Sequence, residues 1–64
     1  MKILLRFEVA GKGEHQFYAS ETAPLPGIGD MVFFADASDL GRFPINQRDF
    51  NYTEQGLVVS YYSN

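Results

Sequence analysis

The stretch PLPGIGDMVFF, residues 24–34, places a rigid turn directly before the most apolar segment of the chain. Pro24 and Pro26 fix φ and lack an amide donor, so they predict a stiff connection rather than a regular element. Asp30 is well placed to accept hydrogen bonds from the turn amides. Residues 31–34, MVFF, then predict a short strand that is buried on both faces, or buried on one face with a partner on the other.

The chain before this turn predicts an N-terminal β-hairpin. Residues 2–9 alternate between apolar and mostly polar positions, which is the period of a half-buried strand. The turn GKGE at residues 11–14 separates them from HQFYAS, residues 15–20, in which His15, Phe17 and Ala19 share a face. Two such runs joined by a short glycine-containing loop favour a hairpin.

The chain after the turn predicts one short irregular segment and two further strands. Residues 35–41 suit a loop or one helical turn, with Asp36 or Ser38 as its cap and Gly41 at its end. Residues 42–52 predict a strand with a bulge or break near Asn46 to Asp49, because the apolar positions change parity there. A last strand is expected in LVVSYY, residues 57–62.

These elements predict an all-β fold in a single domain, residues 1–64, most economically a small five-stranded, partly open barrel. The motif P-x-x-G-D-x-V at residues 26–32, the residues Phe43, Ile45 and Arg48, and the final GLVVSYY resemble segments of small SH3-like barrels of the kind found in short phage or mobile-element proteins. The resemblance covers residues 24–62. It implies an SH3-like barrel in which GLVVSYY is a closing strand, while function does not travel with that fold.

Composition argues against several functions. The chain has no cysteine and one histidine, which excludes disulfides and thiolate zinc sites. Its net charge is −3 and its five cations form no run, so nucleic-acid binding is not expected. No apolar run approaches the roughly 20 residues of a membrane span, and the N-terminus does not resemble a signal peptide, so a cytoplasmic protein is expected.

No catalytic, metal-binding or cofactor-binding group is predicted. His15 lies beside a turn, where a structural role is favoured over catalysis. Asp36 and Asp39 share two positions with a calcium loop, whose other ligands and distal glutamate are missing. The chain is therefore not expected to be an enzyme.

The aromatic side chains give the main functional signal, because so small a core cannot bury them all. Tyrosine, phenylalanine and arginine suit protein interfaces, and the predicted partner-binding residues are Tyr18, Arg48, Phe50, Tyr52 and Tyr61. The alternative is that these rings only cover the open ends of the barrel. The leading hypothesis is a non-enzymatic protein-interaction module, of a phage type that inhibits or redirects a host protein with a basic surface.

Two further expectations concern association. An exposed strand edge is a template for pairing, and LVVSYYSN, residues 57–64, is the expected edge for a homodimer. The alternative function is an oligomeric protein that binds a small ligand, with Arg42, Arg48 and tyrosines holding a nucleotide or another anion at a subunit interface.

Overall fold

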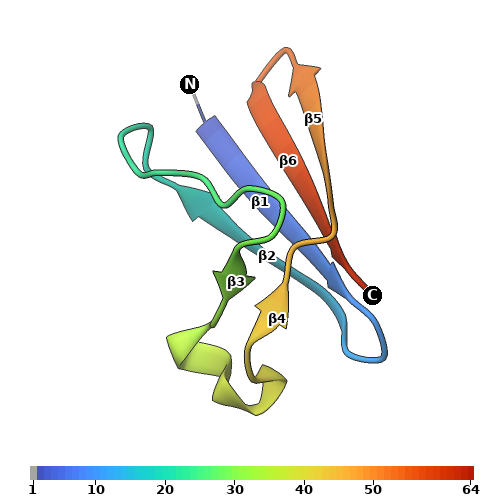
Figure 1. Ribbon diagram of the computed structural model, residues 1–64. Helices are drawn as coiled ribbons and strands as arrows, with labels where there is room; N and C mark the ends of the chain where they lie inside the picture. Colours follow the sequence, from blue (N-terminus) through green and yellow to red (C-terminus); the bar gives the residue numbers. More distant parts are fainter. Residues whose placement is uncertain (1) are drawn as a thin grey trace.

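The computed structural model describes residues 2–64, which form short β-strands and one 3₁₀-helix (Figure 1). The all-β prediction is therefore confirmed. In chain order the elements are β1 (Lys2–Val9), β2 (Gly13–Ala19), β3 (Met31–Val32), η1 (Ala35–Leu40), β4 (Phe43–Pro44), β5 (Gln47–Thr53) and β6 (Gly56–Ser63).

The main sheet is four-stranded, with the order β2-β1-β6-β5. Its two central strands, β1 and β6, run parallel, and each outer strand pairs antiparallel with its central neighbour. The strands β3 and β4 pair only with each other. Because β3 and β4 have two residues each, they cannot join the two edges of the main sheet. The main sheet is therefore open. Residues 2–64 form six strands rather than the five expected, and the SH3-like character of the expected partly open barrel stays a prediction.

The core lies between one face of this sheet and the segment 20–46, which crosses from β2 at one edge to β5 at the other (Figure 1). Parallel neighbours such as β1 and β6 require a crossover of this kind. Phe7 lies at the centre of the core. Its ring stacks on that of Tyr61, with the ring centres 4.8 Å apart. It makes edge-to-face contacts with Phe34 and Phe43, whose ring centres lie 5.1 and 5.9 Å from its own. The other buried hydrophobic residues of this cluster are Ile3, Leu5, Val9, Ile45, Leu57 and Val59.

The N-terminal hairpin and the turn before MVFF are confirmed. β1 and β2 pair antiparallel from Ile3–Ala19 to Val9–Gly13. The Asp30 carboxylate accepts a hydrogen bond from the Gly27 amide at 2.6 Å, as expected for this turn. The backbone of Gly29 and Asp30 is also bonded to Ile45 at 2.9 Å, which fixes the turn against the return of the chain. Within MVFF, Val32 and Phe34 pack on the core and Met31 and Phe33 stay exposed.

Three local predictions fared differently. The strand expected over residues 42–52 breaks between β4 and β5, at residues 45–46, which accounts for the change of parity. Gly41 ends η1 with a φ of 66°, as predicted. The prediction of Asp36 or Ser38 as the helix cap is wrong, because η1 starts after Phe34 and has no side-chain cap.

The C-terminal strand is not an edge. β6 lies between β1 and β5, so the expectation that residues 57–64 offer a free edge for a homodimer is wrong. β6 is central because its alternate residues Leu57, Val59 and Tyr61 are buried beside β1, while Val58 on its other face is also half-covered. The free edges of the sheet are β2 and β5.

Candidate protein-binding surface

Three of the predicted partner-binding residues lie together on β5. Arg48, Phe50 and Tyr52 stand opposite Tyr61, Val59 and Leu57 of β6, so they project from the same face of the sheet as the core. Phe50 and Tyr52 are nevertheless 46% and 75% exposed. We call these three residues the β5 stripe. It combines two accessible aromatic rings with an arginine, the residue types that dominate protein interfaces.

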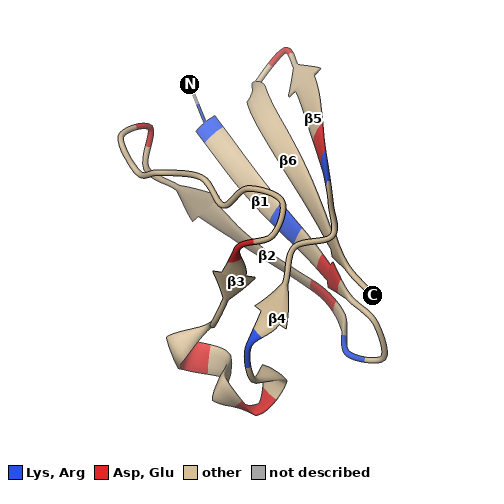
Figure 2. Cartoon of the chain, in the orientation of Figure 1, with Lys and Arg blue, Asp and Glu red and all other residues tan. Residues whose placement is uncertain are grey.

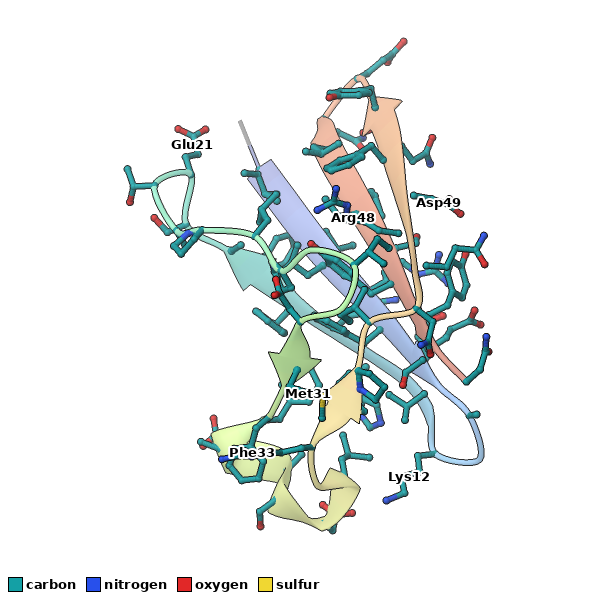
Figure 3. All side chains as sticks on the ribbon, viewed as in Figure 1. Lys12, Glu21, Met31, Phe33, Arg48 and Asp49 are labelled. Atoms are coloured by element: carbon teal, nitrogen blue, oxygen red, sulfur yellow. The ribbon has the colours of Figure 1, made fainter. Side chains whose placement is uncertain are left out.

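The stripe is exposed because the crossing segment stops short of it. That segment covers β1 and β6 and then turns at residues 45–46 into β5 itself. Figure 3 shows Arg48 on the side of β5 that faces the turn, and Asp49 on the opposite side. The outer half of β5 therefore has no layer above its rings, although it belongs to the same face as the core.

Arg48 is held in place from two sides. Its guanidinium lies 4.8 Å from the centre of the Phe50 ring, within the range of a cation–π contact. Its Nη1 donates a hydrogen bond to the carbonyl oxygen of Pro26 at 3.1 Å. The turn that contains Pro26 thus orients Arg48, and the guanidinium of Arg48 lies against one side of the Phe50 ring. The rigid turn therefore also fixes the position of Arg48, at the end of the stripe nearest to it.

Tyr61 does not belong to this surface, and its prediction as a partner-binding residue is corrected. It is only 1% exposed and stacks on Phe7 in the core. Its hydroxyl donates to the same Pro26 carbonyl at 3.0 Å, and burial raises the pKa of this hydroxyl. Its position in β6 requires this, since Tyr61 has the same parity as Leu57 and Val59. Tyr61 is thus a buried neighbour of Arg48 that bonds the same carbonyl oxygen.

Tyr18 is exposed but lies elsewhere. It lies on β2 opposite Leu4 of β1, on the face of the sheet away from the core, and is 68% exposed. The ammonium group of Lys2 lies 5.9 Å from the centre of its ring. Tyr18 and the β5 stripe therefore lie on opposite edges and opposite faces of the sheet, so a single partner surface does not contain all the predicted residues.

A second exposed apolar surface lies on the outside of the crossing segment. Met31 faces the same side as its strand partner Pro44, and all three of Met31, Phe33 and Pro44 are exposed (Figure 3). The signal for it was the apolar character of both faces of MVFF, which predicted burial on both faces or burial on one face with a partner on the other; the exposure of Met31 and Phe33 shows that the chain itself does not bury the second face. The predicted site residues did not include these side chains.

The hollow beside Phe17 does not favour an anion site. The hollow between β2 and η1 has a volume of about 430 Å³ and is lined mostly by Phe17, Phe34 and alanines, without an arginine. In the same hollow, Nε2 of His15 donates a hydrogen bond to the carbonyl oxygen of Lys12 at 3.1 Å. Arg48 is already bonded to Pro26, and Arg42 lies on a different element, before β4. The alternative of a bound nucleotide therefore gains no support from these groups.

Charge is distributed without a dominant patch (Figure 2). The basic residues of the described chain lie on β1, in the turn after it, before β4 and on β5, while acidic residues occur on most elements. Within residues 2–64, no three acidic, histidine or cysteine side chains gather closely enough to hold a metal ion. No helix in this part of the chain has the length and apolar character needed to cross a membrane.

Comparison of the chain with models of known protein families, with curated proteins and with solved structures finds no match.

Proposed function

We propose that this chain is a non-enzymatic protein-interaction module that binds another protein through the β5 stripe. The observation that carries the proposal is the exposure of Phe50 and Tyr52 beside an ordered Arg48, on a face that is otherwise buried as core. Exposed aromatic rings on a core face are costly to leave in water, and covering them gives a binding partner its hydrophobic contribution.

The order of the stripe also favours binding. Immobilising a long side chain on association costs about 0.5–1.5 kcal/mol. Arg48 is already held by the Pro26 carbonyl and the Phe50 ring, so part of that cost is met in the free protein. The net charge of −3 favours encounter with a basic partner surface. The phage-type role of inhibiting or redirecting a host protein, and the SH3-like relationship, stay predictions from the sequence resemblance.

The alternative to binding is that the rings only shield the open end of the core. The two interpretations differ in what happens when the rings are removed. If Phe50 and Tyr52 only shield the core, their loss exposes Leu57 and Val59 beneath them and destabilises the fold. If they bind a partner, their loss removes binding and leaves the fold intact.

The test is photo-crosslinking from a benzoylphenylalanine placed at position 52, in extracts of cells that produce the chain, with position 18 as the matched control. A specific adduct from position 52 that is absent from position 18 supports the proposal. In parallel, the double variant Phe50→Ala and Tyr52→Ala should lose the captured protein while keeping its circular dichroism spectrum, and Tyr18→Ala should retain it. Equal capture by both variants, or unfolding of the double variant, contradicts the proposal.

A further inference from the structure

β5 is an edge strand with few of the features that usually keep edge strands apart, since Arg48 is its one charged side chain on the core face. Its seven residues, Gln47–Thr53, contain no proline, lysine or glycine, and its residues pair one to one with β6, without a bulge. Its one cation, Arg48, and its one anion, Asp49, cancel in charge. Figure 1 shows no segment beside β5 on the side away from β6. Its outward backbone groups are therefore free to pair with another strand.

The other edge differs. β2 begins at Gly13, and its acid, Glu14, is held in an ion pair with Arg6 of β1. Its Phe17 ring is 42% exposed but packs against Phe34 of the crossing segment, with the two ring centres 5.4 Å apart. β5 differs from β2 in carrying two exposed rings on its core face, Phe50 and Tyr52, and in having no net charge.

Phe50 is the central residue of β5, and the side chains at equal distances on either side of it have complementary chemistry. In an antiparallel pair of two β5 strands with Phe50 on the two-fold axis, Phe50 meets Phe50, Arg48 meets Tyr52, and Asp49 meets Asn51. Aromatic–aromatic, cation–π and acid–amide pairs are all favourable across strands. No two like charges stand opposite each other in this register.

We propose that β5 pairs antiparallel with β5 of a second copy of this chain, with Phe50 at the two-fold axis. The inference goes beyond the proposed function, since it uses the backbone edge of β5 and leaves the outer face of the rings open. A two-fold axis that pairs equivalent edges antiparallel stands perpendicular to the sheet, so both core faces lie on the same side. The two β5 stripes then form one continuous surface across the axis.

Other registers are poorer. With Asp49 on the axis, two carboxylates stand opposite each other and fewer residues pair. With Asn51 on the axis, Arg48 loses its opposite residue within the strand. Only the register centred on Phe50 uses all seven residues of β5.

A single pair of strands buries less surface than a permanent interface, so the dimer is expected to be concentration-dependent. The 7.2 kDa chain should show increasing amounts of twice that mass as its concentration is raised, by native mass spectrometry and light scattering. A chain that stays monomeric at every concentration contradicts the inference.

Charge reversal at the axis tests the register. Phe50→Glu places two carboxylates opposite each other, and Phe50→Lys two ammonium groups, so each variant alone should dimerise roughly tenfold or more weakly. A mixture of the two should form a mixed dimer, because the Glu and Lys side chains then meet. The matched controls Gln16→Glu and Gln16→Lys, at the middle of β2, should change neither the homodimer nor the mixture. Failure of the mixture to associate, or an effect of the β2 pair equal to that of the β5 pair, overturns the inference.

A single cysteine gives a readout that does not depend on charge. The chain has no native cysteine, so Phe50→Cys introduces the sole thiol. Opposite residues in an antiparallel pair have Cα atoms about 4.5–5.5 Å apart, which suits a disulfide. Mild oxidation should link Phe50→Cys into a dimer and leave Gln16→Cys largely unlinked; equal linkage contradicts the proposal. The two proposals fail separately, because crosslinking of a foreign protein from position 52 does not depend on whether the edges pair.

Discussion

The two edge strands of the main sheet are built alike and end up in different environments. β2 and β5 each pair antiparallel with a central strand, and each projects aromatic rings from the core face. On β2, the Phe17 ring stacks on that of Phe7, with the ring centres 5.6 Å apart, and makes an edge-to-face contact with Phe34 of the crossing segment. On β5, Phe50 lies against the Arg48 guanidinium and is about half exposed. Both rings stay exposed, Phe17 at 42% and Phe50 at 46%, so the crossing segment decides which ring packs against other aromatic rings rather than which ring is buried.

The difference also separates stability from binding. A ring that is packed on several others contributes to the free energy of folding, and truncating it leaves a cavity. A ring on an uncovered edge contributes little to folding and stays available to a partner. For a chain of this size the whole free energy of unfolding is about 3–10 kcal/mol, so the two kinds of ring are easy to tell apart by experiment.

The largest expected effect distinguishes the two hairpins. Gly56, at the start of β6, has a φ of 145°, and a Cβ there would collide with the backbone carbonyl oxygen of Lys2. Gly56→Ala should therefore cost about 3 kcal/mol or more, a large part of the free energy of unfolding. Gly13→Ala, in the other hairpin, meets open space at a φ of 82° and should cost about 1 kcal/mol. Urea unfolding followed by circular dichroism measures both, and equal costs would contradict this account of the turns.

The next effect compares the rings directly. Phe34→Ala removes the ring that joins the crossing segment to Phe7 and Phe17, and we expect a loss of about 3 kcal/mol. Phe50→Ala should cost less than about 1 kcal/mol in dilute protein, where the edge is unpaired. Thermal and urea unfolding at low concentration give both values. A larger cost for Phe50→Ala than for Phe34→Ala would show that the β5 ring belongs to the core.

The sequence predicted what depends on local pattern. Alternation over residues 2–9 gave the hairpin, and the short spacing of Arg48, Phe50 and Tyr52 placed them on one face of a strand. The same parity argument already separates Tyr18 from Phe17, and it assigns Tyr61 to the face of Leu57 and Val59, although the site prediction did not apply it.

The strand order could not be predicted in this way. The parallel pairing of β1 with β6 joins the two ends of the chain, and no local pattern specifies which strands become neighbours. One signal did exist for β6, since LVVSYY is apolar on both faces, as central strands often are. The exposure of the β5 stripe follows from where the crossing segment ends, which is a tertiary property.

A smaller effect concerns the support beneath the stripe. Tyr61→Phe removes the hydroxyl that donates to Pro26 and should cost about 1 kcal/mol at neutral pH. Burial raises the pKa of Tyr61 above its ordinary value of 10.0, so above about pH 10 the unfolded chain loses this proton before the folded chain does. The stability of the native protein should therefore fall with rising pH in that range more steeply than that of Tyr61→Phe. Parallel pH profiles for the two proteins would contradict the pKa shift.

The smallest effect concerns the turn between β1 and β2, which Lys12 joins to the end of η1. Lys12, between β1 and β2, donates from its Nζ to the carbonyl oxygens of Leu40 and Asp39 at 3.1 and 3.4 Å, at the end of η1. Lys12→Met keeps the aliphatic stem and removes these bonds, with an expected cost of about 0.5 kcal/mol. The local consequence should be clearer: the Gly41 amide, bonded to Ser38 at 3.1 Å, should exchange its hydrogen faster. Lys2→Met, which alters only the contact with Tyr18, is the control, and faster exchange at Gly41 in that variant as well would show that loss of positive charge, rather than the loss of these bonds, loosens η1.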